Sequence, residues 1–378
     1  MPGVTANMKL NQHWSAFAFI WFLTALYSFT RRDLNLVLYH FWPGSIKLGY
    51  YQRPLATILF LVLSFILFWL YFKLVRQPLV QPKTWFKWLI PIAVIGILSY
   101  PMFSYDIFNY LFNAKMVLLY KANPYIHTAS EFVGDAMLRF MQNVHPPAPY
   151  AYGWTIVSLV PGLVWLTQKF TLAFWAMKAF VAVFYFLQIF ILYRLVKKLF
   201  PGDPKRFWLF ALSPLVLVET LLVGHNDVVM MAPALFSFWY LLKSEKLFDR
   251  PWWGSVLWLL LSASIKYATI VLLPLYFLQG LSLKVKRLDI ASLAAVLLLA
   301  VMFTRPGQLH SWYFIWSFSF AVLSRSRKLL AVFTALSIGA LFRYAPYIYF
   351  GHWDSPVSLY RNLIWLAALP LSLVKSVK

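Results

Sequence analysis

The chain has 378 residues, of which 62% are hydrophobic and only 12% are charged, and its mean hydropathy is +0.69. An ordinary globular domain carries about a quarter charged residues, so this composition excludes a protein whose surface mostly faces water. The 34 basic and 11 acidic residues give a net charge of +23. In a soluble protein that excess would indicate nucleic-acid binding, but in a membrane protein it is typical of cytoplasmic loops, and we expect no nucleic-acid partner.

Continuous apolar runs of about 17 to 25 residues predict an all-α polytopic membrane protein, with a single integral membrane domain over residues 1–378. About twelve transmembrane helices are expected. Their ranges are 14–30, 54–75, 88–104, 172–198, 206–223, 226–243, 252–265, 267–279, 288–304, 312–323, 329–345 and 357–375.

Lysine and arginine gather in short segments between these runs, which the positive-inside rule assigns to the cytoplasm together with both termini. Residues 152–168 are also apolar enough to cross, but a crossing there would move the basic cluster at 194–206 outside. We therefore expect a re-entrant or partly horizontal helix at 152–168. The cytoplasmic segments contain Lys73, Arg76, Lys83 and Lys87; Arg194, Lys197, Lys198, Lys205 and Arg206; Lys243, Lys246 and Arg250; Lys284, Lys286 and Arg287; and Arg325, Arg327 and Lys328.

The longest outer segment, residues 105–151, is expected to carry interfacial helices and the active site. Asp106, Asn109 and Asn113 recur at helical spacing beside an apolar stripe, a pattern typical of an amphipathic helix lying in the membrane interface. The stripe comprises Ile107, Leu111, Ala114 and Leu118. A purely structural alternative is that Asp106 only caps this helix. A second short stretch of the same kind is expected at 135–142.

A second polar group interrupts an apolar run at residues 219–227, where Glu219 precedes a turn formed by Gly224, His225, Asn226 and Asp227. The expected topology opens this turn on the same face as Asp106. Polar residues between two spans are costly unless they face protein or water, which indicates a functional site. An ordinary hairpin turn is the alternative. His225 and Asp227 supply only two metal ligands, so a divalent metal stays open and no metal ligands are assigned.

Two later segments add cations and aromatic rings. Lys266 stands alone within an apolar run, and an intramembrane cation is a functional-site hypothesis by default, with snorkelling to the interface as the alternative. Arg305, His310, Trp312 and Tyr313 stand together at the outer start of the next helix. An interfacial aromatic belt accounts for the Trp and Tyr without function, but it does not account for the Arg and His.

These segments together resemble a known family. The run SYDIFNYLFNAKMVLLYKANPY, followed by PYAYGW, GHNDVVMM, SASIKYATIVLLPL and QLHSWYFIW, is similar to bacterial polytopic glycosyltransferases of the GT-C superfamily. The resemblance is strongest to the polyprenol-phosphate-mannose-dependent mannosyltransferases and covers residues from about 85 to 325. One departure is Tyr105, which precedes Asp106 where the family often has a second acid.

The resemblance implies a transferase in the bacterial inner membrane with a periplasmic active site, in which Asp106 is the catalytic base. The implied partners are a polyprenyl-phosphate sugar donor, a glycan, glycolipid or protein acceptor, and membrane lipids. On the chemistry of such a transfer, Lys266 and Arg305 would stabilise the leaving phosphate. The substrate would contact further side chains, namely Asn109, Tyr150, Tyr152, His225, Asn226, Asp227, His310, Trp312 and Tyr313. A transporter or lipid-linked sugar flippase is the alternative, although its acids would be expected nearer the bilayer midplane.

Overall fold

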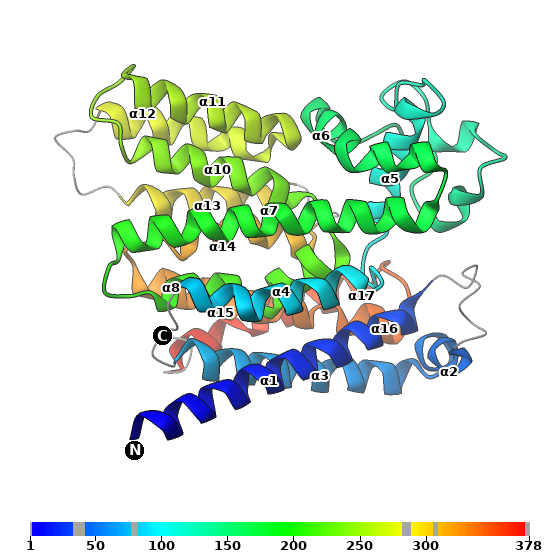
Figure 1. Ribbon diagram of the computed structural model, residues 1–378, viewed down its shortest axis with the longest axis horizontal. Coiled ribbons are helices and arrows are strands. Elements are labelled where there is room, and N and C mark those ends of the chain that lie inside the picture. Colours follow the sequence, from blue (N-terminus) through cyan, green and yellow to red (C-terminus); the bar gives the residue numbers. More distant parts are fainter. Residues whose placement is uncertain (1, 33–41, 77–81, 282–288, 305–308, 375–378) are drawn as a thin grey trace.

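The computed structural model describes residues 2–32, 42–76, 82–281, 289–304 and 309–374, and every regular element in these ranges is helical. The expectation of an all-α protein is therefore confirmed. In Figure 1 the long helices lie side by side along one common direction. The elements up to residue 199 are α1 (Pro2–Ser28), η1 (Phe29–Arg31), α2 (Pro43–Ile46), η3 (Lys47–Tyr51), α3 (Arg53–Val75), α4 (Pro82–Leu98), α5 (Asp106–Leu118), η4 (Ala129–Glu131), η5 (Ala136–Phe140), α6 (Tyr152–Gly162), η6 (Leu163–Thr167) and α7 (Phe170–Leu199).

The second half continues the same arrangement. Helix α10 packs against both α7 and α11, and α13 packs against α14. The elements from residue 205 onward are α8 (Lys205–Ala211), α9 (Pro214–Leu217), η7 (Val218–Val223), α10 (Asp227–Leu241), α11 (Arg250–Ile265), η8 (Tyr267–Leu272), α12 (Leu273–Leu281), α13 (Ile290–Phe303), η10 (Ser311–Tyr313), α14 (Phe314–Ala321), α15 (Arg327–Phe342), α16 (Ala345–Phe350), α17 (Val357–Ala367) and η11 (Leu369–Leu373).

The helices identify a membrane protein. Within the described ranges, three helices are long and apolar enough to cross a bilayer, namely Arg53–Val75, Phe170–Leu199 and Arg327–Phe350. The bent pair Lys205–Ala211 and Pro214–Val223 makes a fourth if it is counted as one span, and shorter apolar helices of 10–17 residues accompany them. Each expected crossing overlaps a described helix, although α4 ends at Leu98, six residues before the expected end of 88–104, and the number of twelve crossings stays a prediction.

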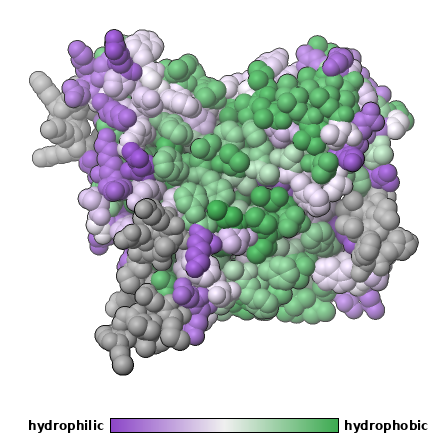
Figure 2. Space-filling view, in the orientation of Figure 1, coloured by the Kyte–Doolittle hydropathy of each residue, from purple (hydrophilic) through white to green (hydrophobic). Residues whose placement is uncertain are grey.

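The two ends of the helix bundle differ from its middle. In Figure 2 hydrophilic residues gather at the left and right edges, and hydrophobic residues cover most of the surface between them. Figure 1 shows both ends of the chain on the left, where the linkers after α7, α10 and α14 also lie, while α5 and the loop after it lie on the right. The basic linkers thus share one end, as expected. The cluster at 284–287 and the last four residues lie outside the described residues.

Protein surrounds helix α5 more completely than its sequence pattern suggests. The helix forms where the periodicity predicts it, but of its polar stripe only Asp106 is partly exposed, because Asn109 and Asn113 are buried along with most of the apolar stripe. Helices α6 and α7 both pack against α5, and Ala114 lies directly beside Gly162 of α6. Polar and apolar residues that recur at helical spacing predict a helix, but they do not say whether protein or solvent covers its polar side. Protein covers most of this helix, and its position at the membrane interface stays a prediction.

The ambiguous segment 152–168 forms α6 and η6. Helix α6 starts beside the end of α11, where Ala151 N–H donates to Ile265 O (3.4 Å) and Gly153 lies against Ser264. From there it leads back to the right-hand side of Figure 1, where α7 begins. This course is consistent with the expected re-entrant segment.

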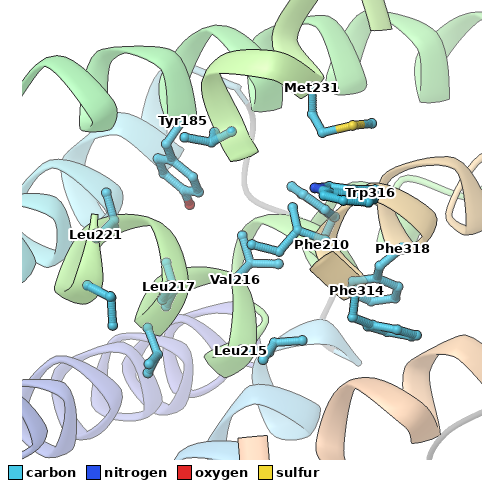
Figure 3. Close-up of a cluster of buried hydrophobic side chains, with 14 of the residues drawn as sticks. Tyr185, Phe210, Leu215, Val216, Leu217, Leu221, Met231, Phe314, Trp316 and Phe318 are labelled. Carbon is cyan, nitrogen blue, oxygen red and sulfur yellow. The ribbon is translucent and has the colours of Figure 1, made fainter. Parts of the chain in front are cut away.

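The functional segments lie around a tightly packed apolar core. Figure 3 shows part of it, where Leu215, Val216 and Leu217 of α9 lie among Phe210, Phe314, Trp316 and Phe318. Nearby, the buried Lys178 of α7 donates to Gly96 O (2.7 Å) and Ser99 O (2.6 Å) at the end of α4. A cation at a helix C-terminus binds carbonyls that have no partner within the helix. This contact fixes the point from which the chain turns toward α5.

Candidate active site

Asp106 is the first residue of α5, and its backbone N–H donates to Ser104 Oγ (3.2 Å). The N-cap position belongs to Tyr105, so Asp106 is not merely a cap. Its side chain remains 23% exposed. Its pKa is raised to about 6, mainly by burial; the positive charge of Lys266 partly opposes this shift, and the negative charge of Asp227 adds to it. A carboxylate that titrates near neutral pH is suited to general-base chemistry.

A row of polar side chains extends inward from Asp106. His225 Nδ1 lies 3.7 Å from Asp106 Oδ2, and His225 Nε2 lies 3.4 Å from Glu219 Oε2. The Tyr344 hydroxyl donates to the other Glu219 oxygen (2.8 Å). The turn that positions His225 depends on Gly224, whose φ of +88° is a conformation that residues with a side chain rarely adopt. The row therefore joins α5, η7 and the end of α15.

Asp227 and Lys266 form a buried ion pair. Lys266 Nζ donates to Asp227 Oδ2 (2.8 Å), and the indole of Trp316 donates to Asp227 Oδ1 (2.6 Å). Lys266 reaches this carboxylate because it has an extended backbone (φ −145°, ψ 132°) at the break between α11 and η8. Its side chain is only 14% exposed, so the snorkelling alternative is wrong. The turn at 224–227 and the cation at 266 belong to one site.

Aromatic rings close one side of this site. The Trp312 ring stacks on His225 (centroids 4.0 Å apart) and on His310 (4.2 Å). The Tyr313 ring lies 5.5 Å from Lys266 Nζ, within cation–π range. Burial, helped by the positive charges of Arg361, Arg343 and Lys266, lowers the pKa of His310 to about 3. His310 is therefore neutral at physiological pH and can both donate and accept hydrogen bonds.

The remaining expected residues differ in position. Tyr110 donates to Asn226 Oδ1 (3.1 Å), and the Tyr150 ring lies 5.1 Å from that of Tyr110, so Asn226 and Tyr150 border the site. Asn109 is buried on α5, and its side-chain oxygen accepts no hydrogen bond from the described residues. Tyr152 is 63% exposed and packs against Tyr125 instead. Arg305 lies outside the described residues.

The described residues contain no group of three or more His, Asp or Glu side chains arranged to hold a metal ion. Both oxygens of Asp227 already accept hydrogen bonds, one from Lys266 and one from Trp316. Asp227 in this arrangement is a partner for a cation of the protein rather than a ready metal ligand.

The sequence analysis missed several contacts. Trp316 was given no role, Glu219 was noted without a role, and Tyr110 and Tyr344 carried no signal. Glu219 alone could have been found, because an acid inside an apolar run is costly without partners. The hydroxyl of Tyr344 is separated from Glu219 by 125 positions in the sequence, and only helix packing brings them together.

Residues 37–281 match the family model for the N-terminal domain of alpha-(1->6)-mannopyranosyltransferases. The match spans more than half of the chain. The chain belongs to this mannosyltransferase family. No curated protein and no solved structure matches it significantly.

The family membership confirms the GT-C-like resemblance and makes the chain a glycosyltransferase enzyme that transfers mannose. It also favours a transferase over the transporter alternative. The matched region contains Asp106, His225, Asp227 and Lys266, whereas Trp312 and the other rings on η10 follow it.

Proposed function

We propose that the chain transfers a mannosyl group from a polyprenyl-phosphate carrier to an acceptor hydroxyl on the outer, periplasmic side of the bacterial inner membrane. The observation that carries this proposal is Asp106, a partly exposed carboxylate beside the buried pair of Asp227 and Lys266. Its raised pKa and its access from the outside are the properties that a general base needs.

The reaction is a single inverting displacement. The acceptor oxygen attacks C1 of the mannose and gives its proton to the Asp106 carboxylate, while the bond from C1 to the phosphate oxygen breaks. The carrier phosphate leaves with the bonding electrons. One carboxylate suffices because the phosphate is already a good leaving group and needs no general acid. An inverting enzyme that forms the alpha linkage of the family name requires a donor of β configuration.

Other residues hold the substrate. The ion pair of Asp227 and Lys266 is fixed on both sides and offers a carboxylate and an ammonium to sugar hydroxyls and to the developing phosphate charge. Trp312 and Tyr313 offer ring faces to the sugar, and neutral His310 offers hydrogen bonds. The His225 ring lies between Asp106 and Glu219, and its two nitrogens, which make no hydrogen bond to the described residues, are available to the substrate.

The side of the membrane follows from charge. The basic linkers lie at the end of the bundle opposite to α5, and positively charged loops remain in the cytoplasm. In this proposal Asp106 faces the periplasm. Nucleotide sugars are absent from that side of the membrane, so a lipid carrier must supply the mannose. The acceptor is a hydroxyl of a glycan, glycolipid or protein at that surface.

Comparison of donors tests this function. Purified protein in lipid nanodiscs would be supplied with polyprenyl-phosphate mannose of β or α configuration, with GDP-mannose, and with polyprenyl-phosphate glucose, together with a pool of membrane glycans. We expect product only from the β-configured lipid mannose, with an alpha linkage by NMR. Transfer from GDP-mannose, or a product that retains the donor configuration, would contradict the proposal.

A further inference from the structure

Two buried arginines near the active site form no ion pair with any acid among the described residues, although the charge of Glu219 acts on Arg343 from a longer distance. The side chain of Arg343, directly after α15, is 1% exposed, and that of Arg361 in α17 is 7% exposed. Arg343 Nη2 donates to Asn362 Oδ1 (2.7 Å), but the Nε atoms of both arginines lack an acceptor. None of the ion pairs among the described residues includes either guanidinium. Leaving a buried charge unpaired costs several kcal/mol, which indicates a site built for an anion.

An aromatic stack holds Arg361 in place. Its guanidinium carbon lies 4.1 Å from the ring centre of Trp353, and the Trp353 and Tyr347 rings stack with centroids 3.7 Å apart and an 8° angle between their planes. Arg31 lies 5.0 Å from the Tyr347 ring and donates to Gly49 O (3.0 Å). The guanidinium groups of Arg31 and Arg361 thus share one aromatic frame, while that of Arg343 lies over the Trp365 ring (5.5 Å), and donors held in this way lose little entropy on binding an anion.

This frame contacts the residues of the active site. Tyr344, next to Arg343 in sequence, donates to Glu219 (2.8 Å) and stacks on Phe103 (4.0 Å). The Tyr105 hydroxyl, adjacent to the proposed base, donates to the backbone oxygen of Arg31 (3.3 Å). Helices α5, α16 and α17 also lie at the same end of the bundle in Figure 1. The unpaired arginines are therefore close to the point where the sugar is transferred.

We propose that Arg343 and Arg361, supported by Arg31, bind the phosphoryl group of the lipid carrier. The inference rests on the proposed function and assigns one part of that site. Lys266 is paired directly with Asp227, whereas among the described residues no carboxylate lies within ion-pair distance of either guanidinium and only the more distant Glu219 acts on Arg343. An incoming phosphate would supply the acceptors that the two Nε atoms lack. The planar guanidinium forms two parallel hydrogen bonds to phosphate oxygens. When the bond to C1 breaks, negative charge accumulates on that phosphate, and fixed cations stabilise it most at that moment.

Binding of carrier without sugar tests the subsite independently of catalysis. A short-chain polyprenyl phosphate and the corresponding polyprenol would be titrated into protein in nanodiscs of neutral lipid, with tryptophan fluorescence as the readout. We expect the phosphate to bind wild type at least about tenfold more tightly than the alcohol. Arg343→Gln and Arg361→Gln each remove most of this difference and leave polyprenol binding unchanged.

Arg194→Gln is the matched control, because Arg194 also lies over a tryptophan ring, that of Trp239 (5.6 Å), but on the exposed surface of α7 near its basic end. It should bind polyprenyl phosphate as wild type does. If Arg361→Gln does not fold, Arg361→Lys decides, since it keeps the charge without the planar fork. An affinity reduced by about threefold or more supports the subsite, and an unchanged affinity overturns it.

The outcomes separate this inference from the proposed function. Inorganic phosphate and phosphatidylglycerol, added as competitors, distinguish the carrier from other phosphates. Competition by either one as effective as that of polyprenyl phosphate would overturn a carrier subsite. Mannosyl transfer by wild type combined with unaltered carrier binding by both arginine variants would leave the proposed function standing and reject the subsite. Arginine-dependent carrier binding without any sugar transfer would do the reverse.

Discussion

The free energy of unfolding should depend strongly on the buried ion pair of Lys266 and Asp227. Asp227 is completely buried, and its two oxygens accept hydrogen bonds from Lys266 (2.8 Å) and Trp316 (2.6 Å). Lys266→Met leaves the carboxylate buried with only the indole as donor. Breaking a buried pair in this way costs about 3–5 kcal/mol, and the slight exposure of Lys266 favours the lower end of that range. Asp227→Asn should cost less, about 1–3 kcal/mol, because the lysine can turn toward water.

Removing both charges should recover most of the loss. In Asp227→Asn/Lys266→Met the asparagine oxygen can still accept from Trp316, and no unpaired charge remains. The coupling energy of this double-mutant cycle should be about 2–3 kcal/mol in favour of the pair. Unfolding by SDS in mixed micelles, followed by fluorescence, measures each free energy. Mannosyl transfer should stay low in the double mutant, because the pair also binds substrate.

Lys169→Met is the matched control, since Lys169 lies exposed at the start of α7 and its loss should change the free energy of unfolding by about 0.5 kcal/mol at most. The reasoning is refuted if Lys266→Met unfolds like wild type, or if the two single changes simply add. Either result would mean that Asp227 is not held as a buried carboxylate by this lysine.

Three further predictions concern pH, a structural lysine and the aromatic wall. Asp106 must be ionised to act as the base and has a pKa of about 6, so kcat/KM should fall as the pH decreases through about 6. Well below that pH, kcat/KM should fall about tenfold for each pH unit. A kcat/KM that does not change between pH 5 and 8 would contradict the assignment. Lys178→Met leaves Ser99 O without this donor, while Gly96 O keeps its contacts with Ser99, and should lower the free energy of unfolding by about 1–3 kcal/mol; an effect as small as that of Lys169→Met would exclude this capping role. Trp312→Ala should raise KM for the lipid donor at least about tenfold, because the Trp312 ring lies beside His225 in the site. Tyr152 lies outside the site, so KM of Tyr152→Ala should stay within about twofold of wild type. Equal effects of the two variants in a donor titration would disprove a role of the Trp312 ring in donor binding.

Much of the site was predictable because its residues violate the apolar pattern around them. Charged or hydrogen-bonding groups stand in or beside a hydrophobic run at Asp106, at the turn 225–227 and at Lys266. Such a placement costs free energy unless the groups have partners, and it can be recognised from the sequence alone. The structure brings all three segments within one cluster of contacts.

The arginine frame was not predictable in the same way. Arg343 and Arg361 stand near the outer ends of their helices, where a basic residue can reach water at little cost, so neither one stands out in sequence. Their burial depends on how α15, α16 and α17 pack beside η1, which no local pattern specifies. The burial of α5 was not predictable for the same reason. A polar stripe indicates that side chains need hydrogen-bond partners, but it does not say whether water or protein provides them.

Transfer of radiolabelled mannose is the most direct test of the role of Asp106. The assay would use β-configured polyprenyl-phosphate mannose, protein in nanodiscs and a pool of membrane acceptors, with wild type beside Asp106→Asn. Thermal unfolding would establish that the two fold equally well. We predict labelled product with wild type and a kcat lower by about 10²–10⁴ with the variant, as for a lost general base. Near-normal turnover by Asp106→Asn would contradict the account.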